Sequence, residues 1–254
     1  MVVLSWLCGA PDEAMDRAGR MLALTESAGN PFHLTTALTI TALAHSWRRE
    51  PEKALDLARR ALLVTRDMGL LFWQARAMSI HHWAATVLEP GTAKVHSEEL
   101  SSALPKLLKG APQGRTAFTP CVVEVYVRAG YVDRAMRELD EALAFVERTD
   151  ERAWSSELHR LRGELLRDSD ESETERAIKR ALEISRMQGA KSFELRAAMS
   201  LAKLYRGAKK SGAAREDVRR CLGSFTEGFG TRDLVEARAL LDAGRRPLSR
   251  TRPS

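Results

Sequence analysis

The sequence is poor in cysteine, with Cys8, Cys121 and Cys221 far apart in a chain of 254 residues. An odd number of isolated cysteines argues against a disulfide framework and favours a reducing compartment. No stretch approaches the ~18 consecutive apolar residues of a membrane-spanning helix. The first residues lack the basic leader and cleavage site of a secretion signal. We therefore expect a cytoplasmic protein that does not contact a membrane.

Motifs for catalysis and cofactor binding are also missing. The sequence has no phosphate-binding G-x-x-x-x-G-K-[ST], no G-x-S-x-G and no H-E-x-x-H. His81 and His82 are adjacent, so on a helix they point about 100° apart and do not chelate one ion as an i, i+4 pair would. The acidic stretch 168–175 lacks the spacing and central glycine of a calcium loop. We expect no enzyme activity, no cofactor and no metal.

Charge of one sign is concentrated at the end of the chain. The net charge is +6 and the pI about 9.5. Four of the positive charges are Arg245, Arg246, Arg250 and Arg252, and the remainder of the chain is close to neutral with both signs interspersed. Residues 244–254 are predicted to be a disordered basic tail. The evidence for a nucleic-acid partner is weak, and a helical solenoid that binds nucleic acid through this tail stays as an alternative.

The most informative feature present is a repeat with a period near 40 residues. Six positions carry Ala or a substitute, and an Ala-Leu pair or a close variant follows each one seven residues later. The anchors are Ala14, Ala54, His96, Ala135, Thr174 and Ala214, separated by 40, 42, 39, 39 and 40 residues. A fixed period of this size is typical of stacked-repeat proteins, which expose a long binding surface and seldom hold a catalytic pocket.

Each repeat is predicted to be a pair of helices. In residues 51–69, small and apolar side chains recur at helical spacing on one face, Pro51 suits the first turn, and Gly69 suits the helix end. Gly29 and Gly189 lie at the same offset from their anchors. Small residues about twelve positions before the anchors mark a preceding helix in several units: Ala42, Ala84 and Ala202.

This pattern of small, large, Gly and Ala positions resembles the tetratricopeptide repeat, in a long form near 40 residues. The resemblance implies an all-α fold, a right-handed α-α superhelix of about six helix-turn-helix repeats. Residues 1–230 would form the array, followed by a capping helix at 231–243. The expected units lie near 1–29, 30–69, 70–111, 112–149, 150–189 and 190–229.

The C-terminal half carries a second, narrower resemblance. Residues 157–166, 181–185, 189–198 and 225–242 are similar to the closing segment of large bacterial signalling regulators, in which a cyclase or winged-helix output domain and a P-loop ATPase precede a tetratricopeptide array. The resemblance implies a non-catalytic sensor or scaffold arm that binds a protein, a peptide or an ATPase or cyclase domain. A free-standing adaptor is the alternative.

The inner face of the array, lined by the first helices, is the predicted binding surface. Counting along each first helix also places Thr39 on this face. The expected partner-binding residues are Trp47, His81, Glu124, Arg128, Glu157, Arg160, Glu164, Arg196, Lys203 and Arg206. The cations at its C-terminal end would suit the carboxylates of an acidic partner segment. For Trp47, aromatic core packing is favoured over a ligand cage.

The first residues suggest a second contact surface. Val2, Val3, Leu4, Trp6 and Leu7 are apolar, and a terminal repeat normally carries a polar cap. We therefore expect an exposed apolar edge at residues 2–7 through which the chain could self-associate.

Overall fold

The computed structural model describes residues 1–109 and 114–243, and these residues contain helices and no strand. The α-helices are α1 (Val2–Leu7), α2 (Pro11–Ala28), α3 (Pro31–Trp47), α4 (Pro51–Met68), α5 (Leu71–Leu88), α6 (Ala93–Leu108), α7 (Thr119–Arg128), α8 (Val132–Thr149), α9 (Ser155–Leu166), α10 (Glu171–Gln188), α11 (Lys191–Leu204), α12 (Ser211–Gly223) and α13 (Arg232–Ala243). Short 3-10 helices occupy Pro90–Thr92, Arg115–Ala117 and Arg152–Trp154. The predicted all-α, superhelical-repeat fold is confirmed.

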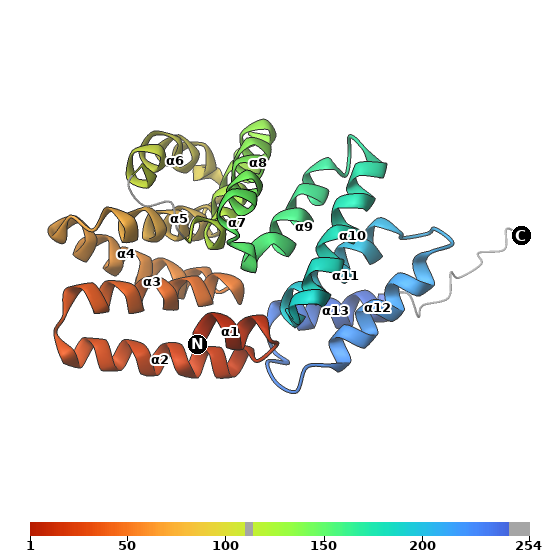
Figure 1. Ribbon diagram of the computed structural model, residues 1–254, viewed down its shortest axis with the longest axis horizontal. Helices are drawn as coiled ribbons and strands as arrows, with labels where there is room; N and C mark the ends of the chain where they lie inside the picture. The colour runs from red at the N-terminus through yellow and green to blue at the C-terminus, as the bar shows by residue number, and fades with distance from the viewer. Residues whose placement is uncertain (110–113, 244–254) are drawn as a thin grey trace, which may run out of the picture.

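The helices form two layers that follow the chain (Figure 1). Each helix packs against its neighbour in sequence, and the first helices of successive pairs also contact one another, from α3 through α5, α7 and α9 to α11. The second helices α2, α4, α6, α8, α10 and α12 lie outside this layer. The first helices therefore form one continuous surface, which we call the inner face.

The anchor residues lie where the helices of a pair meet. Ala54 and Ala135 are fully buried, as is Thr174, whose size is close to that of Ala. Small side chains at these positions let two helices approach closely, so burial explains the repeat in the sequence. His96 is the exception: it lies in α6 with 17% of its side chain exposed.

Several of the second helices end at a residue in the left-handed backbone conformation. Gly29, Gly69 and Gly189 follow α2, α4 and α10 with φ near +65°, and Asp150 takes the same conformation after α8. Glycine is favoured there because it has no Cβ to clash in the left-handed region. Gly228, which lies near the same repeat offset, does not end a helix: α12 ends at Gly223, and Gly228 belongs to the loop before α13.

The two ends of the array contact each other. The Ser192 hydroxyl in α11 donates to the Trp6 carbonyl in α1 at 2.5 Å, and the Gly228 amide donates to the Asp12 carboxylate at 2.8 Å. The Glu227 carboxylate accepts from the amides of Asp12 and Glu13, at 2.9 and 3.0 Å. A carboxylate from the loop before α13 therefore caps the positive end of α2. In Figure 1, α1 and α2 lie beside the segment that joins α12 to α13.

This closure overturns the prediction of an exposed apolar edge at residues 2–7. Val2, Trp6 and Leu7 are buried, with exposed fractions of 5%, 3% and 8%, and Leu4 remains exposed. The sequence pattern was that of an unpartnered face because α11, which covers it together with α3, lies almost 190 residues away along the chain.

The structure also bears on the expected capping helix, the basic tail and the absence of a membrane-spanning helix. The helix α13 spans most of the segment 231–243 that we expected to form a cap, whereas the basic tail 244–254 lies outside the described residues. Among the residues described, no helix is both long and apolar enough to cross a membrane.

Candidate partner-binding surface

The first helices bring seven of the ten predicted binding residues to the inner face. Glu124 and Arg128 come from α7, and Arg196 and Lys203 from α11. The remaining three lie on one side of α9, because positions 157, 160 and 164 are three and four residues apart: Glu157, Arg160 and Glu164. The buried and partly buried charges among them form, together with Arg49 and Asp233, two adjacent groups of ion pairs that we call the inner ion network: Arg49, Glu124, Glu157, Arg160, Arg196 and Asp233.

Arg196 is the centre of this network. Its Nε donates to the Asp233 carboxylate at 2.7 Å, its Nη1 to Glu157 at 3.2 Å, and its Nη2 to the Trp47 carbonyl at 2.9 Å. Arg196 thus joins α11 to α3, α9 and α13. Its guanidinium also lies 5.0 Å from the ring centre of Trp6 in α1, a cation–π distance. One arginine therefore links the beginning, the middle and the end of the array.

Glu157 is a buried, ionised carboxylate with an exposed fraction of 2%. Arg160 donates to it through two nitrogens, each at 2.8 Å, in the bidentate geometry of strong ion pairs. Burial alone would raise the pKa of Glu157, but the charges of Arg160 and Arg196 outweigh it and hold this pKa at about 2. The same pairing raises the pKa of Arg160 above its usual value. Both groups are therefore charged at neutral pH.

Glu124 carries the other half of the network. Arg49 pairs with it at 2.5 Å, the Trp83 indole N–H donates at 2.8 Å, and Arg128 donates at 2.9 Å. Despite burial, which would raise it, these contacts lower the pKa of Glu124. Arg49 has a φ of 61° at the end of α3, where the corresponding repeat positions hold Gly9 and Gly130 with φ of 86° and 81°. A side chain in a conformation that favours glycine is a sign that its contact is needed.

Beyond the network, the inner face ends in exposed charges. Glu164 accepts from the Ser200 hydroxyl at 2.5 Å and pairs with Arg167 at 2.6 Å. Lys203 and Arg206 are exposed and make no ion pair within the described part of the chain. Burial would raise the pKa of Glu236, but the hydrogen bond from Arg232 and the charge of nearby Lys203 together lower it.

Two predicted residues are not available on this surface. Trp47 is 5% exposed and belongs to an aromatic cluster, with its ring centre 4.9 Å from that of Trp6 and 5.3 Å from that of Trp154. The favoured interpretation of Trp47, aromatic core packing, is thus confirmed. His81 points away from the inner face, into a groove between α4 and α6 on the outer side.

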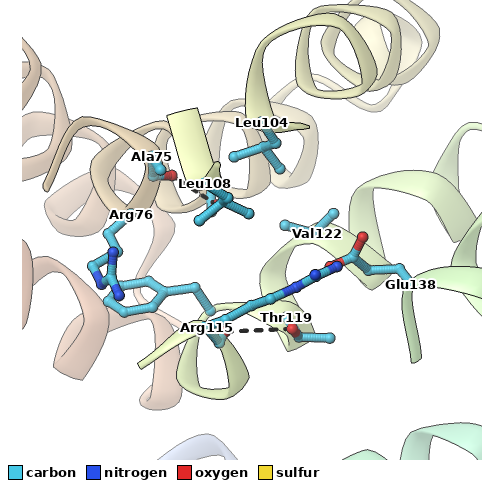
Figure 2. A pocket seen from close by; sticks show the side chains of 10 residues that line it. Ala75, Arg76, Leu104, Leu108, Arg115, Thr119, Val122 and Glu138 are labelled. Atoms are coloured by element: carbon cyan, nitrogen blue, oxygen red, sulfur yellow. Dashed lines mark hydrogen bonds and ion pairs between the residues drawn. The ribbon is translucent and has the colours of Figure 1, made fainter. Parts of the chain in front are cut away.

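The cavity beside the inner ion network is small: it is lined by Arg49, Glu124 and Arg160 and has a volume of about 40 Å³. Figure 2 shows another cavity, of about 20 Å³, which lies between α5, α6, α7 and α8 and is bounded by Leu104, Arg115 and Glu138, with Arg76 at its edge. Pockets for drug-sized ligands have volumes of about 300–1,000 Å³, so any partner of the inner face must bind on its surface.

Arg76 is a buried cation that sequence reasoning missed. Its guanidinium lies 3.2 Å from the ring centre of Phe72, and its Nη1 donates to the Phe72 carbonyl at 2.7 Å. Burial lowers its pKa to about 10, and the charge of Glu151 opposes this effect only in part. Stacking on aromatic rings explains why Arg, whose flat cation packs well, occupies this position.

The network members that sequence reasoning missed are Arg49 and Asp233, and it also missed Trp83 as a hydrogen-bond donor to Glu124. A signal was available for Arg49, because an arginine stands where the neighbouring units have glycine. No local signal marks Asp233, which reaches Arg196 only because α13 folds back onto α11.

No protein-family model matches the chain, and no curated protein sequence matches it. The crystal structure of BtubC (BKLC) from P. vanneervenii is similar in fold, with a TM-score of 0.55 at 16% sequence identity. The match covers 96% of this chain and 97% of that one. At such low identity the likeness concerns the fold alone, and it supports a helical-repeat architecture for the whole described array.

Proposed function

We propose that the protein is a non-catalytic repeat module that binds an acidic segment of a protein partner at the C-terminal end of its inner face. One observation carries this proposal. The buried Glu157 and Arg196 are paired with each other, whereas Lys203 near the end of α11 and Arg206 in the turn after it are exposed without an ion pair in the described chain.

Charge complementarity favours a carboxylate-rich partner. Arg128 and Arg232 are also partly exposed, at 35% and 64% of their side chains. Arginine and lysine side chains form charge-assisted hydrogen bonds with carboxylates, and long-range attraction between opposite charges speeds association. Because the inner cavities are small, the partner is a peptide or protein surface rather than a small cofactor.

A narrower role follows from the sequence resemblances. We propose that the array is a tetratricopeptide-type sensor or scaffold arm of a bacterial, cytoplasmic regulator linked to an ATPase or adenylate cyclase. Binding at the inner face would be coupled to the contacts of Glu227 and Gly228 with α2, which any change in curvature must break. Coupling free energies of about 1–3 kcal/mol are typical of such changes.

The binding proposal is tested with a fluorescent deca-glutamate peptide as the probe. We expect saturable binding by fluorescence anisotropy, and a loss of at least about tenfold in the double variant Lys203→Glu/Arg206→Glu, the equivalent of about 1.4 kcal/mol. The matched control is Lys94→Glu/Lys106→Glu, the same charge change at two exposed lysines of the outer helix α6. Equal losses in the two variants, at unchanged helical circular dichroism, would mean non-specific attraction and would refute a site at the inner face.

The nucleic-acid alternative makes a different prediction. If the basic tail binds nucleic acid, affinity for a random DNA duplex should fall steeply with salt and disappear when residues 244–254 are removed. The peptide affinity should survive that truncation. The regulator hypothesis is tested separately, by sequencing the DNA upstream of the gene segment: an in-frame P-loop ATPase supports it, and an unrelated neighbour favours a free-standing adaptor.

A further inference from the structure

The outer side of the array brings together three metal-binding side chains from two helices. His82 lies in α5, and His96 and Glu99 lie one turn apart on the same side of α6. The Nδ1 atoms of the two histidines are 2.9 Å apart. The Glu99 carboxylate oxygen lies 3.5 Å from the His82 Nδ1 and 3.9 Å from the His96 Nδ1.

These separations fit one tetrahedral ion. Zn–N and Zn–O bonds of about 2.0–2.1 Å place neighbouring ligand atoms about 3.3 Å apart around a tetrahedral centre. The three distances lie on both sides of that value, so shifts of a few tenths of an ångström would let all three atoms bind one ion. A hydrogen bond between the two imidazoles is the competing explanation of the shortest distance.

The surroundings suit a zinc-type site rather than a calcium or magnesium site. Two imidazoles and one carboxylate are typical ligands of Zn²⁺, whereas Ca²⁺ and Mg²⁺ prefer oxygen ligands throughout. His82 is 5% exposed, so its imidazole is held in place by the surrounding side chains of α5 and α6. Glu99 is 57% exposed and leaves the site accessible.

The site opens into a groove of about 870 Å³ between α4 and α6, lined among others by Arg59, Arg66, His81 and Glu98. Three protein ligands leave the fourth position of a tetrahedral ion free for water or an anion. The two arginines favour an anion there. The His81 Nδ1 is buried and has no hydrogen-bond partner among the described residues, so it adds a further polar atom near the site.

We propose that His82, His96 and Glu99 bind a Zn²⁺ ion in the outer groove. The deviation of the sequence from its own repeat supports this assignment. His96 occupies an anchor position that holds a small residue in the other units, and its imidazole is much larger than the methyl groups of Ala14 and Ala54 at the same position. Two adjacent histidines, His81 and His82, gave no reason to expect a metal. In the structure His96 of α6 supplies the second imidazole beside His82, which His81 cannot do because it points in another direction.

The experiment measures Zn²⁺ binding to the chain without a polyhistidine tag, after treatment with EDTA. Competition with a chromophoric chelator should give one Zn²⁺ per chain. Co²⁺ should produce the visible absorption bands of tetrahedral coordination, which two hydrogen-bonded imidazoles would not. The ion should also raise the melting temperature, because it binds the folded state.

Variants identify the ligands. His96→Ala restores the residue typical of the repeat and should still fold, yet weaken Zn²⁺ binding by more than about 100-fold, the upper range for losing even an outer-sphere partner. Glu99→Gln should lose the Co²⁺ bands while keeping the shape of the side chain. The matched control His33→Ala, at an exposed histidine of α3, should bind as the parent does. No stoichiometric binding by the parent, or equal binding by His96→Ala, would overturn the proposal.

Discussion

The inner face and the outer groove use their polar residues in opposite ways. On the inner face, Arg196 and Glu157 are buried, Glu124 is partly buried, all three are paired, and the adjoining cavity is about 40 Å³. In the outer groove, of about 870 Å³, the polar atoms converge with few partners. Paired buried charges hold the array in one curvature, because breaking a pair would leave a charged group with neither its partner nor water around it. The converging side chains of the outer groove join no buried ion pairs, so they are available to bind a ligand.

The largest expected effect comes from breaking the inner network at its centre. Arg196→Ala should lower the free energy of unfolding by about 3 kcal/mol, since it leaves the partly buried Asp233 without its ion-pair partner, the buried Glu157 with Arg160 alone, and the Trp47 carbonyl without its donor. Urea denaturation measures the loss. Arg20→Ala, which removes an exposed pair with Asp16 on the outer helix α2, should cost under about 1 kcal/mol. A similar small loss for Arg196→Ala would show that the network is solvated like a surface pair.

A pH titration sharpens the comparison at Glu157. Because its folded pKa is lowered to about 2 from an ordinary 4.5, its ionisation stabilises the fold above pH 4.5, and this stabilisation is lost as the pH falls towards 2. At 1.36 kcal/mol per pKa unit the contribution at neutral pH is about 3 kcal/mol. Glu157→Gln should therefore lose stability at pH 7 but change less than the parent between pH 5 and 2. Parallel curves for the two proteins would contradict a depressed pKa.

The contact between the two ends of the array can be disrupted by a substitution that changes no charged residue. Gly228 has a φ of 70°, and a Cβ there would overlap the Pro11 ring. Gly228→Ala should cost about 1–3 kcal/mol through backbone strain and displacement of the loop from α2. Limited proteolysis should then cut more readily in residues 225–230. Gly19→Ala, in the open middle of α2, is the control and should be stabilising by up to about 1 kcal/mol.

The smallest effect is expected in the outer groove. His96→Ala should change the free energy of unfolding of the metal-free protein by less than about 1 kcal/mol, because Ala suits the anchor and the groove admits water to His82. Thermal denaturation in EDTA measures this. A loss comparable to that of Arg196→Ala would mean that the imidazole pair is structural, and the contrast between the two regions would fail.

Much of the fold could be predicted because it depends on local patterns. The anchors at Ala54 and Ala135, with glycine or its substitute fifteen residues later, specify a helix that packs closely and then stops. Helical spacing also placed Glu157 and Arg160 together on one face. Spacing within a helix could not reveal Arg49 or Asp233 as partners, since their contacts join helices far apart in the chain.

The sequence by itself determined that this protein is a stack of helix pairs near 40 residues in length, because short-range periodicity dictates which faces must be buried. Only the tertiary structure decided that α11 and the loop before α13 meet α1 and α2, covering Trp6, and that His82 meets His96. The physical reason is geometric. The rotation from one pair to the next is small and accumulates along the stack, so whether the ends touch depends on all the packing angles together and on no single repeat.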